Sequence, residues 1–439
     1  YAMRSYFGRI NYDYAGKYLF EANVRMDGSS RFAPGNRWGT FPSFSAAWRI
    51  SEEDFWKDLK PIVDNLKIRA SWGRLGNNGI GNYDWQNVYS PANTSFGDAI
   101  QQGVWTTAIA NRDISWEKTD VVDLGLDVNL FGSLSLTFDY YNKLTHGILY
   151  RNPIPYVNGG LGAPMINSAK VRNRGFEFSA FYNKNFGDLG FAVSVNGAYN
   201  RNEIIDYKGD YLEINGATVW TEGQPIGKFY MREIDHIVQD KAEIDKLVSE
   251  GWTFSPSRPE PGDFLYKDLN NDKRIDDKDR VLKGQPLPLF TFGGSIAFSY
   301  KNFDLSALFS GVSGWDRYLS TGIFSLTNAD TERLFLKKFQ NQWSETNRNT
   351  NIPKLYASNE KNNQVSDYYL YDASFLRLKT LQLGYTLPKN LIPKVRIRAY
   401  CNLENYFTIT SYPGMDPEMN GDVGYPILKT VSLGVNIKF

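Results

Sequence analysis

The last fifteen residues, Tyr425 to Phe439, read YPILKTVSLGVNIKF and decide the fold. Successive side chains of an extended strand point to opposite faces. One face of this stretch is wholly apolar and the other is polar or small; the apolar face holds Val431, Leu433, Val435, Ile437 and Phe439. In water, such a strand would be exposed and prone to aggregation, unless its edge is paired and its apolar face meets lipid. The stretch therefore predicts the closing strand of a membrane-spanning barrel.

The same alternation recurs along most of the chain and predicts about thirteen strands. For example, Val122 to Leu130 alternates apolar and polar residues, Phe131-Gly132-Ser133 turns, and Leu134 to Tyr140 alternates again. The connections are short and long in turn, which is typical of outer-membrane barrels with tight periplasmic turns and broad external loops. We expect long extracellular loops at about residues 76–115, 201–288 and 313–367. Because such barrels normally have an even number of strands, we also expect strands to be missing before Tyr1.

Composition supports a single large all-β structure and excludes several classes of function. No shift in composition marks a domain boundary within the 439 residues, so residues 1–439 are interpreted as one barrel portion. No run approaches the ~20 apolar residues that a membrane helix needs. The net charge of +1 gives no reason to expect nucleic acid as a partner. The single cysteine, Cys401, excludes a disulfide framework within the chain and falls on an apolar strand face.

The start of the chain lacks the marks of a secretion signal. Residues 1–14 read YAMRSYFGRINYDY, which already alternates like a strand. They have no basic start followed by an apolar core and a small-residue cleavage site. We therefore expect a mature chain, a truncated chain, or the C-terminal piece of a longer protein.

Several motifs in combination resemble one transporter family. They are Phe41 to Glu52 (FPSFSAAWRISE), Pro261 to Asn270 (PGDFLYKDLN), Pro286-Leu287-Pro288 before Phe292-Gly293-Gly294, Trp343 followed by Asn351 to Leu355 (NIPKL), and Ser374 to Lys379 (SFLRLK) before Leu383-Gly384-Tyr385. Together they resemble the SusC-like (SusC/RagA) TonB-dependent outer-membrane transporters of Bacteroidota. The resemblance spans the whole chain.

This resemblance implies an architecture and a set of partners. The family has a twenty-two-stranded barrel, an N-terminal plug, a TonB box coupled to the inner-membrane TonB–ExbB–ExbD motor, and a SusD-like surface lipoprotein over the mouth. The present sequence lacks the plug, the box and the early strands, so it resembles the C-terminal portion. The resemblance implies a multi-pass outer-membrane protein, in contact with lipid, that imports a glycan or oligopeptide and is not an enzyme.

A calcium loop is predicted within the longest connection, at Asp268 to Asp279 (DLNNDKRIDDKD). Oxygen-bearing side chains stand at positions 1, 3, 5, 9 and 12, and position 7 offers a carbonyl, as in an EF-hand or dockerin loop. The ligands would be Asp268, Asn270, Asp272, Arg274 through its carbonyl, Asp276 and Asp279. Lys273 replaces the usual glycine at position 6, and Asp279 is shorter than the usual Glu. The alternative interpretation is an acidic, solvated turn.

Aromatic residues in the expected loops are candidates for stacking on a sugar or peptide. They are Tyr83, Trp85, Tyr89 and Trp105, with Trp220, Tyr230 and Trp252 further along the chain. Ring faces offer apolar, polarisable area to a ligand that is otherwise wet. Packing within the loops, or a girdle at the membrane edge, explains any single ring more simply.

Two short helices are expected in the long connections, at Asp240 to Gly251 and Asn328 to Trp343, where apolar residues recur at helical spacing. Each could pack its own loop or face an external partner. Catalytic chemistry finds little support, because the only histidines, His146 and His236, lie in different segments. The glycine-rich run Gly73 to Gly81 opens no helix and therefore does not indicate a phosphate cradle.

Two other functions are also consistent with this sequence. A passive porin would share the barrel but lack a plug and a TonB motif. A secreted all-β adhesin or glycan-binding module would be soluble without detergent, and its outward faces would be polar instead of carrying Val431, Leu433, Val435 and Ile437.

Overall fold

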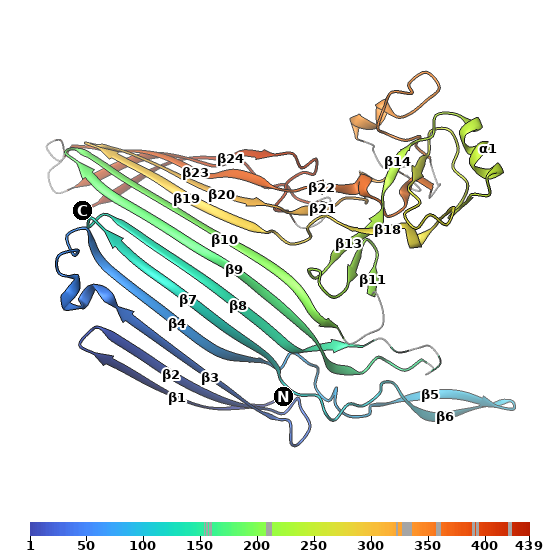
Figure 1. Ribbon diagram of the computed structural model, residues 1–439, viewed down its shortest axis with the longest axis horizontal. Helices are drawn as coiled ribbons and strands as arrows, with labels where there is room; N and C mark the ends of the chain where they lie inside the picture. Colours follow the sequence, from blue (N-terminus) through green and yellow to red (C-terminus); the bar gives the residue numbers. More distant parts are fainter. Residues whose placement is uncertain are drawn as a thin grey trace. The chain divides into compact units, whose positions relative to one another are not determined.

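The computed structural model describes residues 1–152, 154, 157, 160–207, 213–321, 324–326, 336–356, 361–388, 391, 395–419 and 424–439. Nearly all regular structure within these residues is β (Figure 1). The main sheet has 13 strands, as the alternation predicted. No helix in the described part of the chain is both long and apolar enough to cross a membrane.

The strands of the main sheet lie in chain order, antiparallel to their neighbours. They are β1 (Met3–Tyr14), β2 (Tyr18–Ser29), β3 (Trp38–Arg49), β4 (Val63–Asn77), β7 (Glu117–Leu130), β8 (Leu134–Arg151), β9 (Met165–Phe186), β10 (Leu189–Tyr207), β19 (Phe290–Tyr300), β20 (Phe303–Ser313), β23 (Phe375–Thr386), β24 (Arg396–Thr410) and β25 (Thr430–Lys438). The chain divides into two compact units. The first holds Tyr1–Asn185, Ala192–Tyr211 and Glu222–Gln224, and the second holds the remaining residues.

The final strand has the two faces that its sequence predicted. In the β24–β25 register, Leu433 lies opposite Cys401, and Val435 lies opposite Ala399. Leu433 is 83% exposed and Val435 is 61% exposed. These large apolar side chains therefore have no protein core to enter, which is the expected surface of a strand that faces hydrocarbon.

Short connections close one end of the strand pairs by tight turns. Ala15 and Gly16 between β1 and β2 both have positive φ angles, of 54° and 66°, as do Phe131 and Gly132 between β7 and β8, at 55° and 61°. Two consecutive residues of positive φ give the turn whose twist matches that of paired strands. Glycine supplies one of the two positions at little steric cost.

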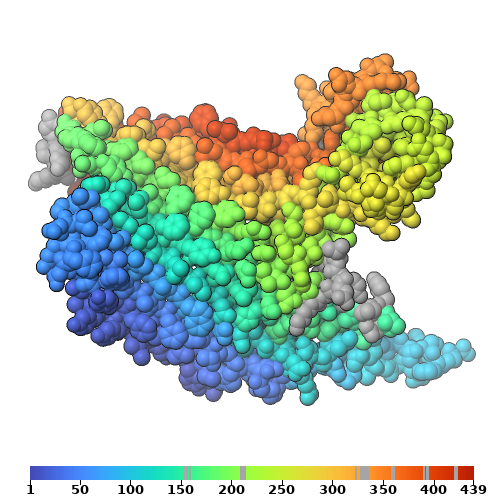
Figure 2. Space-filling view, viewed as in Figure 1, coloured from blue at the N-terminus to red at the C-terminus, as the bar shows by residue number. Residues whose placement is uncertain are grey.

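The first long connection contains structure that the sequence analysis missed. Residues 76–115 were expected to be a loop, but β4 extends to Asn77, and β5 (Tyr89–Phe96) pairs with β6 (Ala99–Thr106). This hairpin turns at Gly97, whose φ is 63°. Within the first unit, Figure 2 shows it extending away as a pale blue arm. Polar residues interrupt its strands at irregular intervals, as in Asn93-Thr94-Ser95 and Gln101-Gln102, so they lack the apolar alternation by which a strand is recognised.

The second and third long connections fold into small strands and one helix. Between β10 and β19 these are β11 (Glu213–Asn215), β12 (Thr218–Trp220), β13 (Lys228–Arg232), β14 (Ile234–Ile237), α1 (Lys241–Ser249), β15 (Thr253–Phe254), β16 (Phe264–Tyr266), β17 (Arg274–Ile275) and β18 (Arg280–Lys283). After β20 come β21 (Asp316–Tyr318) and β22 (Leu370–Asp372). β10 itself extends to Tyr207, beyond the expected boundary at residue 201.

The helix expected at Asp240 to Gly251 is confirmed as α1. The Asp240 side chain accepts a hydrogen bond from the Glu243 N–H at 3.1 Å and caps the N-terminus, and Gly251 follows the helix with a φ of 90°. The helix expected at Asn328 to Trp343 is described only in its second half. Residues 328–335 lie outside the described residues, and Lys337–Asn341 forms a 3₁₀ helix.

These connections share a hydrophobic core in the second unit, which we call the connection core. It contains Ile237, Val238, Ile244, Phe264, Leu265, Tyr266, Ile275, Leu326, Phe339, Trp343, Ile352 and Tyr369. The helix α1 contributes Ile244, which is 1% exposed. Figure 2 shows yellow-green and orange segments, from the two connections, packed against each other. A conventional core therefore stabilises segments that the sequence analysis treated as loops.

Candidate functional site

The polar face of β4, β7 and β8 carries a charged cluster centred on Arg69. Gly125 of β7 lies opposite Arg69 on the neighbouring strand β4. It also lies opposite Asp139 on the other neighbouring strand, β8. The Arg69 guanidinium contacts Asp139 at 2.6 Å, Asp127 at 3.3 Å and Asp123 at 3.4 Å. Arg69 is thus held by three carboxylates from two neighbouring strands.

Gly125 makes this arrangement possible. A Cβ atom on Gly125 would collide with the Arg69 guanidinium, which lies across the strand at this point. The absence of a side chain therefore lets Arg69 reach Asp139 on the next strand. Asp127 also pairs with Lys67 at 3.5 Å. Three carboxylates and two cations leave the cluster with a formal charge of −1.

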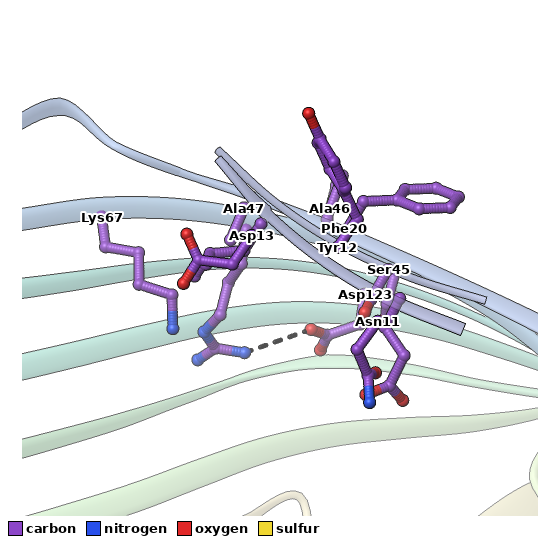
Figure 3. A pocket seen from close by; sticks show the side chains of 14 residues that line it. Asn11, Tyr12, Asp13, Phe20, Ser45, Ala46, Ala47, Lys67 and Asp123 are labelled. Carbon is purple, nitrogen blue, oxygen red and sulfur yellow. Dashed lines mark hydrogen bonds and ion pairs between the residues drawn. The ribbon is translucent and has the colours of Figure 1, made fainter. Parts of the chain in front are cut away.

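A cavity of about 540 Å³ lies beside this cluster (Figure 3). Its polar lining includes Asn11, Asp13, Lys67 and Asp123, which Figure 3 shows on one side of the strands. The rings of Tyr12 and Phe20 point the other way, as strand alternation requires. The polar side offers both hydrogen-bond donors and acceptors to a hydrated ligand.

The second unit has a similar arrangement at β20, β23 and β24, in which an arginine crosses a glycine to reach a carboxylate. Arg398 lies across Gly384 and pairs with Asp304, to which its Nε donates at 2.9 Å. It also donates to Gln382 at 2.8 Å. Sequence analysis did not single out Arg69 or Arg398. The available signal was an arginine on a polar strand face with a glycine and carboxylates on nearby strands, and that pairing becomes visible only in the register.

The predicted calcium loop forms a series of tight side-chain-to-backbone turns. Asp268 accepts from the N–H groups of Asp272 at 3.3 Å and Lys273 at 2.9 Å, and Asp272 accepts from Arg274 at 2.8 Å. Asp279 is fully buried and accepts from the backbone N–H groups of Leu269 and Asp276, both at 2.9 Å.

Three residues of this loop make further side-chain contacts. Lys273 adopts a φ of 61°, and its Nζ donates to the Glu250 carbonyl at 3.1 Å, where α1 ends. The Arg274 side chain pairs with Asp276 at 2.9 Å. Asn270 donates to Asp272 at 3.1 Å. Within the described residues, no three His, Cys, Asp or Glu side chains gather as a metal site by themselves.

The four aromatic residues predicted to bind substrate are not brought together. Trp85 packs against the buried cluster of Phe32, Phe41, Ile80, Ile114 and Trp116. Tyr89 pairs with Thr106 and Trp105 with Ser90, so these two rings lie on opposite faces of the β5–β6 hairpin. Tyr83 has a φ of 68° and is 62% exposed. Of the later rings, Trp252 lines a cavity beside α1, whereas Trp220 and Tyr230 lie in β12 and β13.

The histidines pair with carboxylates in separate units. His146 contacts Asp120 at 3.0 Å. His236 contacts Asp235 at 2.9 Å and Glu243 at 2.5 Å. Burial lowers the pKa of His236, but the hydrogen bonds that its ring donates to the Glu243 and Asp235 carboxylates outweigh burial and raise the pKa above its usual value.

Comparison with known proteins identifies the family. A family model described as "TonB dependent receptor-like, beta-barrel" matches residues 1–405. The chain belongs to this family. TonB-dependent receptors are outer-membrane proteins, so the predicted localisation is confirmed, and the alternative of a secreted soluble module is wrong.

Several relatives sharpen the family assignment. TonB-dependent receptor P3 of Formosa agariphila is 34% identical over 465 residues, which cover 99% of this chain and 45% of that protein. TonB-dependent receptor SusC of Bacteroides thetaiotaomicron is 31% identical, over 99% of this chain and 43% of that protein. The predicted resemblance to SusC-like receptors is therefore confirmed. The chain spans about half the length of these relatives.

A solved structure gives the same result. The chain superposes on the structure of the RagAB peptide transporter with a TM-score of 0.82 and 28% identity. The match covers 99% of this chain and 47% of that chain. The predicted all-β, antiparallel barrel fold is confirmed by this match together with the family.

Proposed function

We propose that this chain is the C-terminal wall of an outer-membrane TonB-dependent importer for an oligomeric nutrient, a glycan or an oligopeptide. The observation that carries the proposal is the family match over residues 1–405, with strands that have one apolar and one polar face. The apolar faces would meet lipid and the polar faces would line the transport path. The long connections at 76–115, 201–288 and 313–367 would be extracellular.

The proposed whole protein has a twenty-two-stranded barrel and an N-terminal plug. TonB–ExbB–ExbD would supply energy through that N-terminal part, and a SusD-like lipoprotein would cover the mouth. Support comes from SusC and from the RagAB peptide transporter, which this chain resembles over its whole length. The chemistry proposed is transport, with no bond made or broken.

The polar face supports an oligopeptide somewhat more directly than a neutral glycan. The Arg69 cluster combines a guanidinium with three carboxylates, so it presents charges of both signs. Peptides carry charged termini and side chains that such groups recognise by charge-assisted hydrogen bonds. Tyr83, Tyr89 and Trp105 expose rings that would add stacking contacts at the mouth.

Uptake in cells tests the proposal. We would delete the gene, supply labelled oligopeptides and oligosaccharides, and restore uptake with the full-length gene. Energy-dependent uptake that disappears with a protonophore or without TonB supports the importer. Uptake that persists in both conditions supports the passive porin. Unchanged uptake of every oligomer in the deletion strain would contradict both functions.

We also propose that the loop Asp268 to Asp279 binds Ca²⁺ and stabilises the connection core. Its oxygen spacing suits a hard cation, and Lys273 links the loop to the end of α1. The test is the metal content of the purified full-length receptor, with an Asp268→Ala/Asp272→Ala variant beside an Asp98→Ala/Asp245→Ala control. Calcium should be lost only from the loop variant. Equal calcium in both variants, or none in the wild type, would rule the site out.

A further inference from the structure

On the lipid-side face of β4, β7, β8 and β9, the side chains change from apolar to polar or charged along the length of the strands. Toward the short turns, this face is apolar on all four strands. Near the end of the apolar band, the register aligns Trp72 with Val122, Leu124 with Tyr140, and Tyr140 with Phe176. Aromatic rings at this level are typical of the edge of the hydrocarbon layer.

The same face becomes charged beyond this level on β4, β7 and β9. Alternation brings basic side chains to that face two residues further along β4 and β9, at Arg74 and Arg174, and four residues further along β7, at Lys118. In β8 the next residues of that face are Asn142 and Leu144, and His146 follows them. The register sets Arg74 opposite Asp120, Lys118 opposite His146, and Lys170 opposite that same His146. We call this set the basic belt: Arg74, Lys118, Lys170, Arg172, Arg174 and Arg201.

Contacts from β10 place Arg201 in the belt. The Tyr199 ring stacks on Phe176 with centroids 5.4 Å apart, and Glu203 contacts Arg174 at 3.8 Å. Tyr199 and Glu203 therefore share the face of Phe176 and Arg174. Arg201 stands between them in the same strand and points the same way.

The other face of β9 and β10 at this level is covered by protein. Val171, Asn202 and Ile204 are all buried there, and Ile204 is 1% exposed. The basic belt therefore belongs to the outer surface of the wall and not to the polar face that holds Arg69.

Carboxylates neutralise only part of the belt. Arg74 contacts Asp120 at 2.7 Å, Arg174 contacts Glu203, and Lys170 contacts Asp206 at 2.9 Å.

The other three members, Lys118, Arg172 and Arg201, form no ion pair with any residue in the described ranges. The Arg172 Nε is buried and has no hydrogen-bond partner there. Three cations therefore stand just outside an apolar band without a protein counter-charge.

We propose that the basic belt binds the phosphate groups of the phosphorylated glycolipid in the outer leaflet. A phosphate at the membrane edge offers the charge and the acceptor oxygens that these cations lack. The inference rests on the proposed orientation, in which the long connections are extracellular. It concerns the lipid surface and does not depend on what the receptor imports.

Lipid binding to the full-length receptor in detergent tests this inference. Native mass spectrometry would compare lipid A with enzymatically dephosphorylated lipid A. The wild type should prefer the phosphorylated lipid by about tenfold, equivalent to about 1.4 kcal/mol. A Lys118→Gln/Arg201→Gln variant should lose most of this preference.

A charge-matched control uses two basic residues of the polar face, in Arg9→Gln/Lys143→Gln. This control should keep the wild-type preference. Heat-modifiable migration in gels would verify that each variant is folded. Equal binding of both lipids by the wild type, or equal loss in belt and control variants, would overturn the proposal. Loss of a co-purified acidic protein from the belt variant, with lipid preference unchanged, would also overturn it.

Discussion

The main sheet and the connection core are stabilised in opposite ways. In β25 the large apolar side chains are exposed, and Leu433 is 83% exposed. In the connection core, Val238 and Leu326 are fully buried. The sheet places apolar groups outside and ion pairs such as Arg69–Asp139 on its other face, whereas the connection core is built like a water-soluble domain. Each region therefore responds to a different solvent, lipid in one and water in the other.

The largest effect is expected from opening the connection core. Phe264→Ala would remove a ring that is 4% exposed and packs against Tyr368 with centroids 5.2 Å apart. Removal of a buried Phe costs ~3–5 kcal/mol, so this core should unfold locally while the sheet stays intact. Hydrogen exchange of α1 would report the change. Phe303→Ala, on the exposed face of β20, is the control and should leave α1 protected; equal loss of protection would contradict the distinction.

A charge on the lipid face is expected to have the next largest effect. Leu433→Arg near the membrane midplane should cost ~2–4 kcal/mol, because a guanidinium would enter hydrocarbon. Reversible unfolding in lipid vesicles measures this free energy. The neighbouring Ser432→Arg places the same charge on the polar face and should cost much less. Similar losses for the two variants would count against insertion of this strand.

A smaller and more local effect is expected from Gly125, across which Arg69 reaches its carboxylates. Gly125→Ala would put a methyl group where the Arg69 guanidinium lies, so its bonds to Asp139 and Asp127 would weaken. We expect a loss of ~1–3 kcal/mol in unfolding free energy, the range for disrupted charged hydrogen bonds. Gly8→Ala, in β1, meets nothing within 4 Å and is the control. If both substitutions behave alike, the close approach has no energetic role.

His236 should make the connection core weakly sensitive to pH. Because its pKa is raised in the folded protein, its contribution is fully present below about pH 6.5, the unfolded value. It is lost as the pH rises through the raised folded value. The effect should be under ~1 kcal/mol, because the pair with Glu243 is partly exposed. Hydrogen exchange of α1 at pH 5.5 and 8.5 would show it, and His236→Gln should abolish the difference.

Glu53, in a short connection of the sheet, should show the opposite dependence and the smallest effect. Hydrogen bonds from Tyr18, Lys17 and Trp48 lower the pKa of Glu53 to about 2. Its contribution is therefore present above about pH 4.5, the unfolded value, and is lost as the pH falls through about 2. Fluorescence of Trp48 between pH 6 and pH 2 would follow the change. A variant with Glu53→Gln should be insensitive over this range.

The sequence predicted the strands of the main sheet better than it predicted the structure of the long connections. Alternation located the apolar face of Val431 to Ile437, and about thirteen strands were expected where the sheet has 13. The same signal failed at Tyr89 to Thr106, because the apolar residues of the β5–β6 hairpin do not alternate with polar ones. Of the helix expected at Asn328 to Trp343, the described residues contain a 3₁₀ segment at Lys337–Asn341, and its Phe339 packs into the connection core.

Local periodicity by itself determined that this chain builds a two-faced sheet with tight turns, because strand direction and side-chain alternation follow from each short stretch. Only the tertiary structure decided which distant residues meet. Arg69 reaches Asp139 across Gly125, and the cations of the basic belt align over four strands, because strand register fixes these neighbours. Register depends on turns and on pairing between segments far apart in the chain, so no single stretch contains it.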